Sequence, residues 1–172
     1  MNNPEILSLP AGFAPNSRVW IYQAGRRFTP AETSETRRLL SSFVNSWNSH
    51  GHPVKGFADL FYSQFIILMA DETVSGVSGC STDSSVHLIK QIEQQTGNGL
   101  FDRLNLAFYV GGAVLLTPMA ELPQDLASGR IDASTLYFNN TVQTKAELEE
   151  KWLIPLKDSW LASRYLKHAL KA

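Results

Sequence analysis

The chain contains a single cysteine, Cys80, among its 172 residues. A lone cysteine cannot form a disulfide within its own chain, and disulfides are rare in the reducing cytoplasm. A chain of this length buries enough apolar surface in one core to fold without cross-links or metals. We therefore expect a cytoplasmic protein whose folding requires no disulfide.

Long apolar runs are also missing. The longest strongly apolar run covers residues 65–70, whereas a membrane-spanning helix needs about 20 such residues. The first seventeen residues contain no Lys, no Arg and no apolar stretch of the kind found in secretory signals. The sequence therefore predicts a soluble protein without a membrane span.

Neither sign of charge is in excess. Lys and Arg number 15 against 16 Asp and Glu, which gives a formal net charge of -1. No field of the whole molecule would attract a phosphate polymer, so we expect no nucleic-acid partner. No glycine is followed by lysine, which excludes the GxxxxGK[ST] phosphate loop, and the GxGxxG and GxSxG patterns are absent as well. We expect no nucleotide hydrolysis and no cofactor.

The hydrophobic fraction of 44%, with four Trp and nine Phe, is typical of a globular protein. Residues 19–22 have the composition of a strand. Thr29, Pro30 and Glu32 then supply an N-cap, a first helical residue and a capping box. The apolar residues that follow at helical spacing, until Gly51 and Pro53 end the helix, are Leu39, Leu40, Phe43, Val44 and Trp47.

The middle of the chain predicts a second helix and four further strands. Residues 57–62 and 65–70 form either a tight hairpin or one long bent strand. A helix follows that is capped within residues 81–83, faces inward with Val86, Leu88, Ile89 and Ile92, and ends at Gly97 and Gly99. Strands at 105–110 and 113–117 flank a two-residue turn. This order predicts an α+β fold, a ferredoxin-like split βαβ antiparallel sheet with both helices on one face.

We expect a single domain over residues 1–172, with an irregular N-terminal arm (1–17), an α+β core (18–118) and a mostly helical C-terminal extension (119–172). The extension contains an expected helix at 119–128 and a short strand at 135–138. Thr144 and Glu147 form a second capping box, which opens a helix to Trp152. A last helix runs from Asp158 or Ser159 to about residue 170.

Cys80, Asp83 and His87 are candidate catalytic residues. Asp83 and His87 are spaced i and i+4 on one helix face, and Cys80 is expected just ahead of the first turn. Helix N–H groups and a nearby imidazole are the features that activate a cysteine nucleophile. The alternative is that the Ser, Thr and Asp residues only cap the helix and that Cys80 only packs, which we favour.

Three further groups have a competing structural explanation. His50 and His52 offer two imidazoles, but their spacing matches no standard metal motif, and we expect no metal. Arg26, Arg27, Arg37 and Arg38 form a basic group with Glu32 and Glu35 interleaved, which favours a solvated surface with charge pairs. Basic residues near the C-terminus accompany apolar ones in an amphipathic pattern, which favours packing on the same domain, with dimerisation as the main alternative.

Four segments resemble a family of short bacterial proteins of unknown function that are often labelled "ABC transporter ATPase". They are RVWIYQAGRRFT, SGCSTDSSVHLIKQIEQ, FDRLNLAFY and TLYFNNTVQTKAELEEKWLIPLKDSW. This chain lacks the phosphate loop and the signature motif of such an ATPase, so the label does not describe its chemistry. The resemblance implies candidate binding surfaces at Asn139, Asn140, Lys157, Asp158 and Trp160.

Two functions follow from these residues. The first is a non-catalytic cytoplasmic module that binds a partner protein or a second copy of itself, since a complete core is present without a recognised catalytic set. The second is a small thiol-dependent enzyme or redox sensor that uses Cys80. We favour the binding module.

Overall fold

The computed structural model describes residues 7–73 and 76–166, and these form two compact units. The N-terminal unit consists of residues 5–102 together with 142–149. The C-terminal unit contains residues 103–141 and the chain from 150 onward. Each unit is described by itself, and the single-domain organisation stays a prediction.

The N-terminal unit is built on a three-stranded antiparallel sheet of order β1-β5-β4. Its strands are β1 (Arg18–Gln23), β4 (Lys55–Phe61) and β5 (Phe65–Asp71), and every residue of the central strand β5 is buried. Strands β4 and β5 form the tight hairpin rather than one bent strand. The turn residues Tyr62 and Ser63 both have positive φ, 52° and 50°, as a type I′ turn requires.

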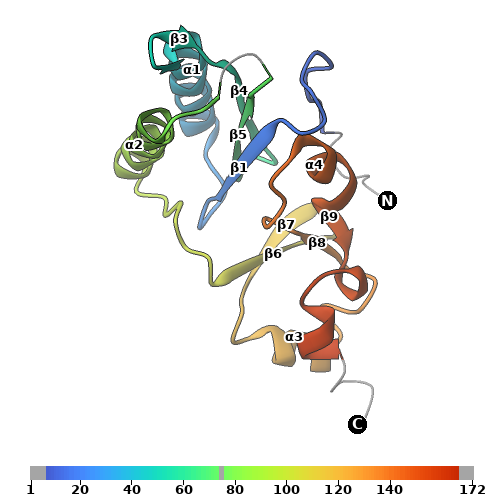
Figure 1. Cartoon of the computed structure of the whole chain (residues 1–172). Helices are drawn as coiled ribbons and strands as arrows, with labels where there is room; N and C mark the ends of the chain where they lie inside the picture. The colour runs from blue at the N-terminus through green and yellow to red at the C-terminus, as the bar shows by residue number, and fades with distance from the viewer. Residues whose placement is uncertain (1–6, 74–75, 167–172) are drawn as a thin grey trace. The chain divides into compact units, whose positions relative to one another are not determined.

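Both helices of this unit cover the same face of its three-stranded sheet (Figure 1). Helix α1 (Pro30–Ser46) begins with the expected capping box of Thr29 and Glu32. Helix α2 (Gly79–Thr96) ends at Gly97, whose φ of 62° forms a left-handed C-cap. The buried cluster between helices and sheet consists of Ala24, Phe28, Leu40, Leu60, Ile66, Leu68, Leu88, Ile89, Ile92 and Leu100.

Helix α2 begins earlier than predicted. Its N-cap is Ser78, whose hydroxyl accepts a hydrogen bond from the Ser81 N–H. Cys80 therefore lies inside the first turn of the helix and not ahead of it. The reason is that Ser81, the first of the expected caps, is buried and donates its hydroxyl to the Asn48 carbonyl at 2.8 Å.

A small hairpin follows α1 and consists of β2 (Asn48–Ser49) and β3 (His52–Pro53). Its turn is His50-Gly51, again with two positive φ values, 50° and 82°. Helix α1 thus ends at Ser46, before the predicted stop at Gly51. Trp47 is the C-cap of α1, and its indole N–H donates to the Ser81 carbonyl at 3.0 Å, which ties this end of α1 to α2.

The N-terminal arm is irregular from residue 7 to residue 17, as predicted, and residues 1–6 lie outside the described chain. Asp71 anchors it, because its buried carboxylate accepts hydrogen bonds from the Ala14 N–H and from the Lys55 ammonium. Residues 142–149 return to the same arm through backbone hydrogen bonds from Lys145 to Ser17 and from Ala146 to Pro15. They include the start of α4 (Lys145–Lys151), where the Thr144 hydroxyl accepts from the Glu147 N–H as predicted.

The C-terminal unit contains a four-stranded antiparallel sheet of order β7-β6-β8-β9. The strands are β6 (Asn105–Val110), β7 (Ala113–Pro118), β8 (Leu136–Phe138) and β9 (Leu153–Pro155). Short helices accompany them, namely α3 (Leu122–Ala127), the 3-10 helix η1 (Leu156–Asp158) and the π-helix η2 (Ala162–Leu166). Its core consists of Leu106, Phe108, Leu122, Ile131, Tyr137, Leu156 and Leu161.

The mixed α+β class is confirmed, but the ferredoxin-like sheet is not found. Strand β6 pairs with β7 and β8, and none of the three pairs with the β1-β5-β4 sheet in the described chain. The extension predicted as mostly helical supplies two strands to this second sheet, because β8 satisfies the backbone groups of the free edge of β6 and β9 in turn pairs with β8. The predicted last helix is described only as far as Leu166, and its remaining residues lie outside the described chain. No helix in residues 7–73 and 76–166 has the length and apolarity that crossing a membrane requires.

Candidate functional site

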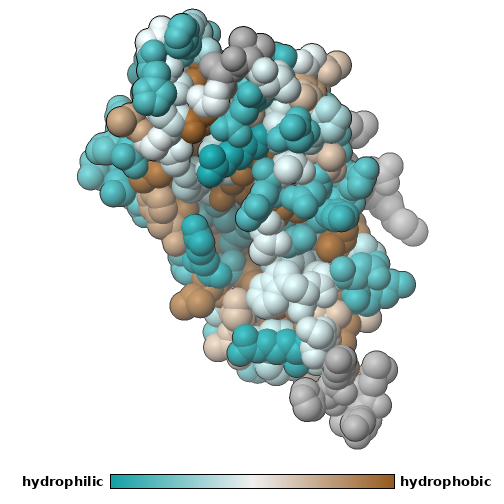
Figure 2. Space-filling model, in the orientation of Figure 1, coloured by the Kyte–Doolittle hydropathy of each residue, from teal (hydrophilic) through white to brown (hydrophobic). Residues whose placement is uncertain are grey.

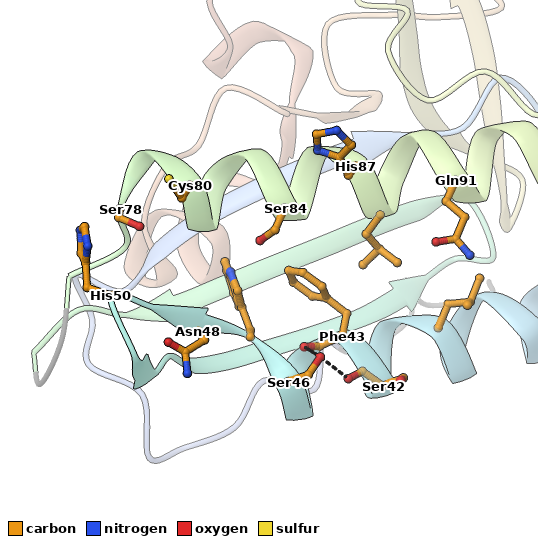
Figure 3. A pocket seen from close by; sticks show the side chains of 13 residues that line it. Ser42, Phe43, Ser46, Asn48, His50, Ser78, Cys80, Ser84, His87 and Gln91 are labelled. Carbon is orange, nitrogen blue, oxygen red and sulfur yellow. Dashed lines mark hydrogen bonds between the residues drawn. The ribbon is translucent and has the colours of Figure 1, made fainter.

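An open groove of about 850 Å³ runs between α1 and α2 in the N-terminal unit (Figure 3). Its apolar part comes from Leu39, Phe43, Trp47 and Leu88. Figure 2 shows hydrophobic surface in scattered patches between hydrophilic residues on the face of the molecule that it presents. Beneath the groove, Leu40 of α1 and Ile89 of α2 belong to the buried cluster between the helices and the sheet.

The polar part of the groove carries no formal charge. The thirteen lining residues include no Lys, Arg, Asp or Glu. Hydroxyl, amide, imidazole and thiol groups border it instead, from Ser42, Ser46, Asn48, His50, Ser78, Cys80, Ser84, His87 and Gln91. A groove of this composition favours a neutral ligand, because a charge brought to its apolar floor would lack an opposite charge.

A stripe of α2 residues forms one border of the groove. Cys80, Ser84, His87 and Gln91 are spaced i, i+4, i+7 and i+11, which places them on one side of the helix. In Figure 3 the Ser84 side chain points toward α1, whereas the His87 ring and the Cys80 thiol lie along the outer side of α2. The thiol of Cys80 is exposed.

The three candidate catalytic residues do not form a connected set. Cys80 and His87 are seven residues apart on one helix, so they are separated by about 10 Å along its axis. Nδ1 of His87 lies 2.8 Å from the main-chain oxygen of Asp83. Because a carbonyl oxygen only accepts, Nδ1 of the neutral ring carries the proton. The Asp83 carboxylate does not line the groove, so the imidazole is held by the backbone and not by that side chain.

The end of the groove near Cys80 is fixed by serine hydroxyls. The Ser78 and Ser81 hydroxyls lie 2.9 Å apart, and the Ser49 hydroxyl donates to the Gly76 carbonyl at 2.8 Å. The Ser78 N–H in turn donates to the Ser49 hydroxyl at 3.1 Å. The sequence indicated the serines at the start of α2 only as helix caps, and the structure adds that Ser78 and Ser81 join α2 to the hairpin after α1.

The α1 border of the groove was missed by sequence reasoning. Ser42 and Ser46 were read only as residues of a helix, and Phe43 only as part of its apolar face. Their spacing of i and i+4 is the signal that one polar stripe runs beside the apolar one. The sequence alone therefore shows the polar stripe on α1, but it does not show that this stripe faces α2.

His50 and His52 share the hairpin turn but not a metal site. His50 lines the groove, and His52 is exposed on β3. Among the residues that the structure describes, no group of three His, Cys, Asp or Glu side chains is arranged to hold a metal ion.

The candidate binding residues Asn139 and Asn140 form part of the framework of the C-terminal unit. The Asn140 side-chain oxygen accepts from the Trp152 indole at 3.0 Å. The Asn139 side-chain oxygen accepts from the Thr141 hydroxyl at 2.6 Å, which closes a turn after β8. These amides therefore have structural partners already.

Lys157, Asp158 and Trp160 lie in the same unit and are exposed. The Trp160 side chain is 43% exposed and is hydrogen-bonded to the Tyr137 hydroxyl. Burial raises the pKa of that tyrosine, and the hydrogen bond from Trp160 opposes the rise. The structure thus presents these three side chains to solvent, in a different unit from the α1–α2 groove.

The basic group near α1 consists largely of charge pairs, as predicted. Arg26 pairs with Glu32, Arg37 with Asp59 and Arg38 with Glu35, at 2.6–2.9 Å. The hydrogen bonds from Arg26 lower the pKa of Glu32 to about 2, and bonds from Thr29 add to the effect.

Comparisons with protein families, with curated proteins and with solved structures find no match for this chain. The resemblance to short bacterial proteins stays a prediction. The function therefore has to be argued from the groove and from the side chains around it.

Proposed function

We propose that this protein is a non-catalytic binding module, and that the α1–α2 groove binds an uncharged, partly apolar segment of a partner protein. The observation that carries the proposal is the composition of the groove, an apolar floor with a border of neutral polar groups. Binding sites are mostly apolar clefts of roughly 300–1,000 Å³ in which a few polar groups fix the orientation of the ligand. A groove of about 850 Å³ falls within this range.

The spacing of the candidate catalytic residues supports binding over catalysis. A general base has to reach its proton within about 3 Å, directly or through one water. Cys80 and His87 are two helical turns apart, and the Asp83 carboxylate is not part of the groove. The hydroxyl and amide groups of the border are suited instead to hydrogen bonds with the backbone of a bound segment.

The thiol of Cys80 is exposed and lines the groove, so disulfide capture at this residue can report which ligands the groove binds. Small fragments that carry one common disulfide linker and a neutral apolar, a cationic or an anionic head group are equilibrated with the protein under mild reduction. Intact-mass spectrometry then measures which fragments Cys80 captures. We expect neutral apolar head groups to be captured preferentially. Capture that does not depend on the head group, or that prefers charged ones, would contradict the proposal.

A matched pair of variants localises the effect. Ser42 lines the groove, whereas the adjacent Ser41 is exposed and does not line it. Ser42→Phe should reduce the capture of neutral apolar fragments, and Ser41→Phe should leave it unchanged. Equal capture by both variants would place the bound fragments outside the groove.

Size-exclusion chromatography with light scattering tests whether the groove is occupied by a second copy of the chain. A concentration-dependent dimer that Ser42→Phe dissociates and Ser41→Phe preserves would assign the groove to self-association. A monomer at all concentrations would leave a different protein as the partner.

Thiol chemistry at Cys80 is the second candidate function. The observation in its favour is that an exposed thiol lies in the first turn of an 18-residue helix, where N–H groups stabilise a thiolate. Alkylation by iodoacetamide that is already fast at about pH 7 and barely accelerates above it would support this function. A rate that keeps rising beyond about pH 8, as for an ordinary thiol, would end it.

A further inference from the structure

A second pocket lies where α1 begins, also in the N-terminal unit but apart from the α1–α2 groove. Its volume is about 680 Å³, and Phe28 and Pro30 form its apolar part. The other lining residues all carry hydrogen-bond donors: Arg27, Arg37, Thr33, Ser34 and Ser63. No carboxylate lines it.

The walls of this pocket are fixed by the fold. The Phe28 N–H donates to the Ser63 carbonyl at 2.8 Å, which holds the β4–β5 turn against the loop before α1. The Phe28 side chain is buried in the main cluster of this unit. The Ala24 N–H donates to the Gln64 carbonyl at 2.8 Å, one residue beyond Ser63. These backbone hydrogen bonds hold the segments that carry Ser63 and Arg27, both of which line the pocket, against each other.

The donors that line the pocket have spare capacity. Arg27 has no ion-pair partner among the described residues, unlike the three arginines near it. Arg37 uses Nε for Asp59 and Nη2 for the Leu60 carbonyl, both at 2.9 Å, which leaves its Nη1 group available. The hydroxyls of Thr33, Ser34 and Ser63 have no hydrogen-bond partner in the described part of the chain.

We propose that this pocket binds the phosphoryl group of a small ligand. Arg27 supplies a positive charge that is unpaired in the described chain and forked donors that match phosphate oxygens, and Arg37 adds its Nη1 group. Three hydroxyls from α1 and from the β4–β5 turn add donors from other directions, which suits a tetrahedral anion with three or four oxygens better than a planar carboxylate. The proposal rests on these side chains and not on the helix end, because Thr29 already accepts the Glu32 N–H there.

The test is a titration with inorganic phosphate and, separately, with O-phosphoserine, with sodium chloride adjusted to keep the ionic strength constant. Amide chemical shifts in the NMR spectrum report the site. We expect saturable shifts at residues 27–37 and 63. Tighter binding of O-phosphoserine would identify a phosphomonoester as the ligand, and tighter binding of inorganic phosphate would identify the free anion.

Arg27→Gln should weaken the binding of both probes about tenfold or more, because it removes charge-assisted hydrogen bonds. Arg38→Gln is the matched control, since it removes the same charge from a residue that does not line the pocket. Thr33→Val keeps the side-chain shape, removes one hydroxyl and should weaken binding by a smaller factor. Shifts that do not saturate, or equal losses in Arg27→Gln and Arg38→Gln, would overturn the proposal.

Discussion

The side chain of Asn98, just after α2, forms two hydrogen bonds with the backbone of Arg26, as a neighbouring backbone segment would. Its oxygen accepts from the Arg26 N–H at 3.0 Å, and its nitrogen donates to the Arg26 carbonyl at 2.9 Å. The Gly25 N–H donates to the Gly99 carbonyl beside this pair. Asn98 is 1% exposed, so water cannot replace these bonds if the side chain is removed.

Asn98→Ala should therefore lower the free energy of unfolding by about 1–3 kcal/mol, because the Arg26 N–H loses its partner in a buried setting. Asn45→Ala on the exposed surface of α1 is the control and should change it by less than about 0.5 kcal/mol. Urea denaturation followed by tryptophan fluorescence measures both. Equal effects of the two variants would show that the Asn98 side chain has no special role.

At the same scale, the sequence identified Asp83 and His87 as members of one helix face but not how their side chains are used. The i and i+4 spacing of Asp83 and His87 is correct. The His87 ring bonds to the Asp83 backbone and not to its carboxylate. A spacing rule fixes which residues are neighbours on a helix, whereas the choice between a side-chain and a main-chain acceptor depends on rotamers and solvation.

The ring of Trp47, the C-cap residue of α1, packs directly against β4 at Gly56. A Cβ atom on Gly56 would lie 2.7 Å from the Trp47 ring, closer than any real contact. The ring cannot move away easily, because Trp47 is buried and its indole N–H is bonded to Ser81 on α2. This contact sets the position of one lining residue of the groove.

Gly56→Ala should consequently lower the free energy of unfolding by about 1–3 kcal/mol, the usual cost of overpacking. Gly12→Ala serves as the control, because nothing lies within 4 Å of a Cβ at that position. Chemical denaturation measures the stabilities, and the emission maximum of the tryptophans reports displacement of the ring. An alanine accepted at position 56 without loss would mean that the ring moves freely.

The start of α2 shows why an element boundary was predicted incorrectly. Ser78, Ser81, Thr82 and Asp83 are all good N-cap residues, and propensity alone cannot rank them. The hairpin after α1 decides, because Asn48 engages Ser81 and leaves Ser78 as the cap.

Ser78→Ala should cost about 1 kcal/mol of stability, as the loss of an N-cap usually does. It should also accelerate hydrogen exchange in the first turn of α2, which mass spectrometry after short labelling times detects. Thr82→Ala is the comparison, since the Thr82 hydroxyl only donates to the Ser78 carbonyl one turn earlier. A larger effect at Thr82 would contradict the assignment of the cap.

At the scale of the whole molecule, the carboxylates of Asp71 and Glu32 make the free energy of unfolding depend on pH in the acidic range. Hydrogen bonds from Lys55, then from Thr73 and Ala14, hold the pKa of Asp71 far below its usual range, and Arg26 lowers that of Glu32 to about 2. A lowered pKa in the folded state contributes stability above the unfolded-state values of about 3.9 for Asp and 4.3 for Glu. This contribution is lost as the pH falls through the folded-state values.

The free energy of unfolding should thus be nearly constant between about pH 5 and 7 with respect to these groups, and should fall below about pH 4. Asp71→Asn should lower it at neutral pH and make the acid dependence shallower. Asp83→Asn removes the same charge from an exposed residue and should preserve the slope. Urea titrations at several pH values check this, and an unchanged slope in Asp71→Asn would refute it.

The sequence by itself determined the local elements of this protein. Thr29, Pro30 and Glu32 set the start of α1, the apolar run of residues 65–70 marked the strand β5, and Gly111-Gly112 marked a two-residue turn. These features depend on dihedral preferences and on hydrogen bonds between near neighbours. The α+β class followed from their order.

Only the tertiary structure decided which strands share a sheet and which helix faces meet. The turn at Gly111-Gly112 pairs one edge of β6 with β7, but the sequence contains no signal that assigns the other edge to β8 rather than to the β1-β5-β4 sheet. The groove likewise needs Phe43 and Ser84 from helices that are distant in the chain. Such pairings depend on the total apolar area buried and on backbone groups satisfied across long sequence separations, and these are properties of the packed chain.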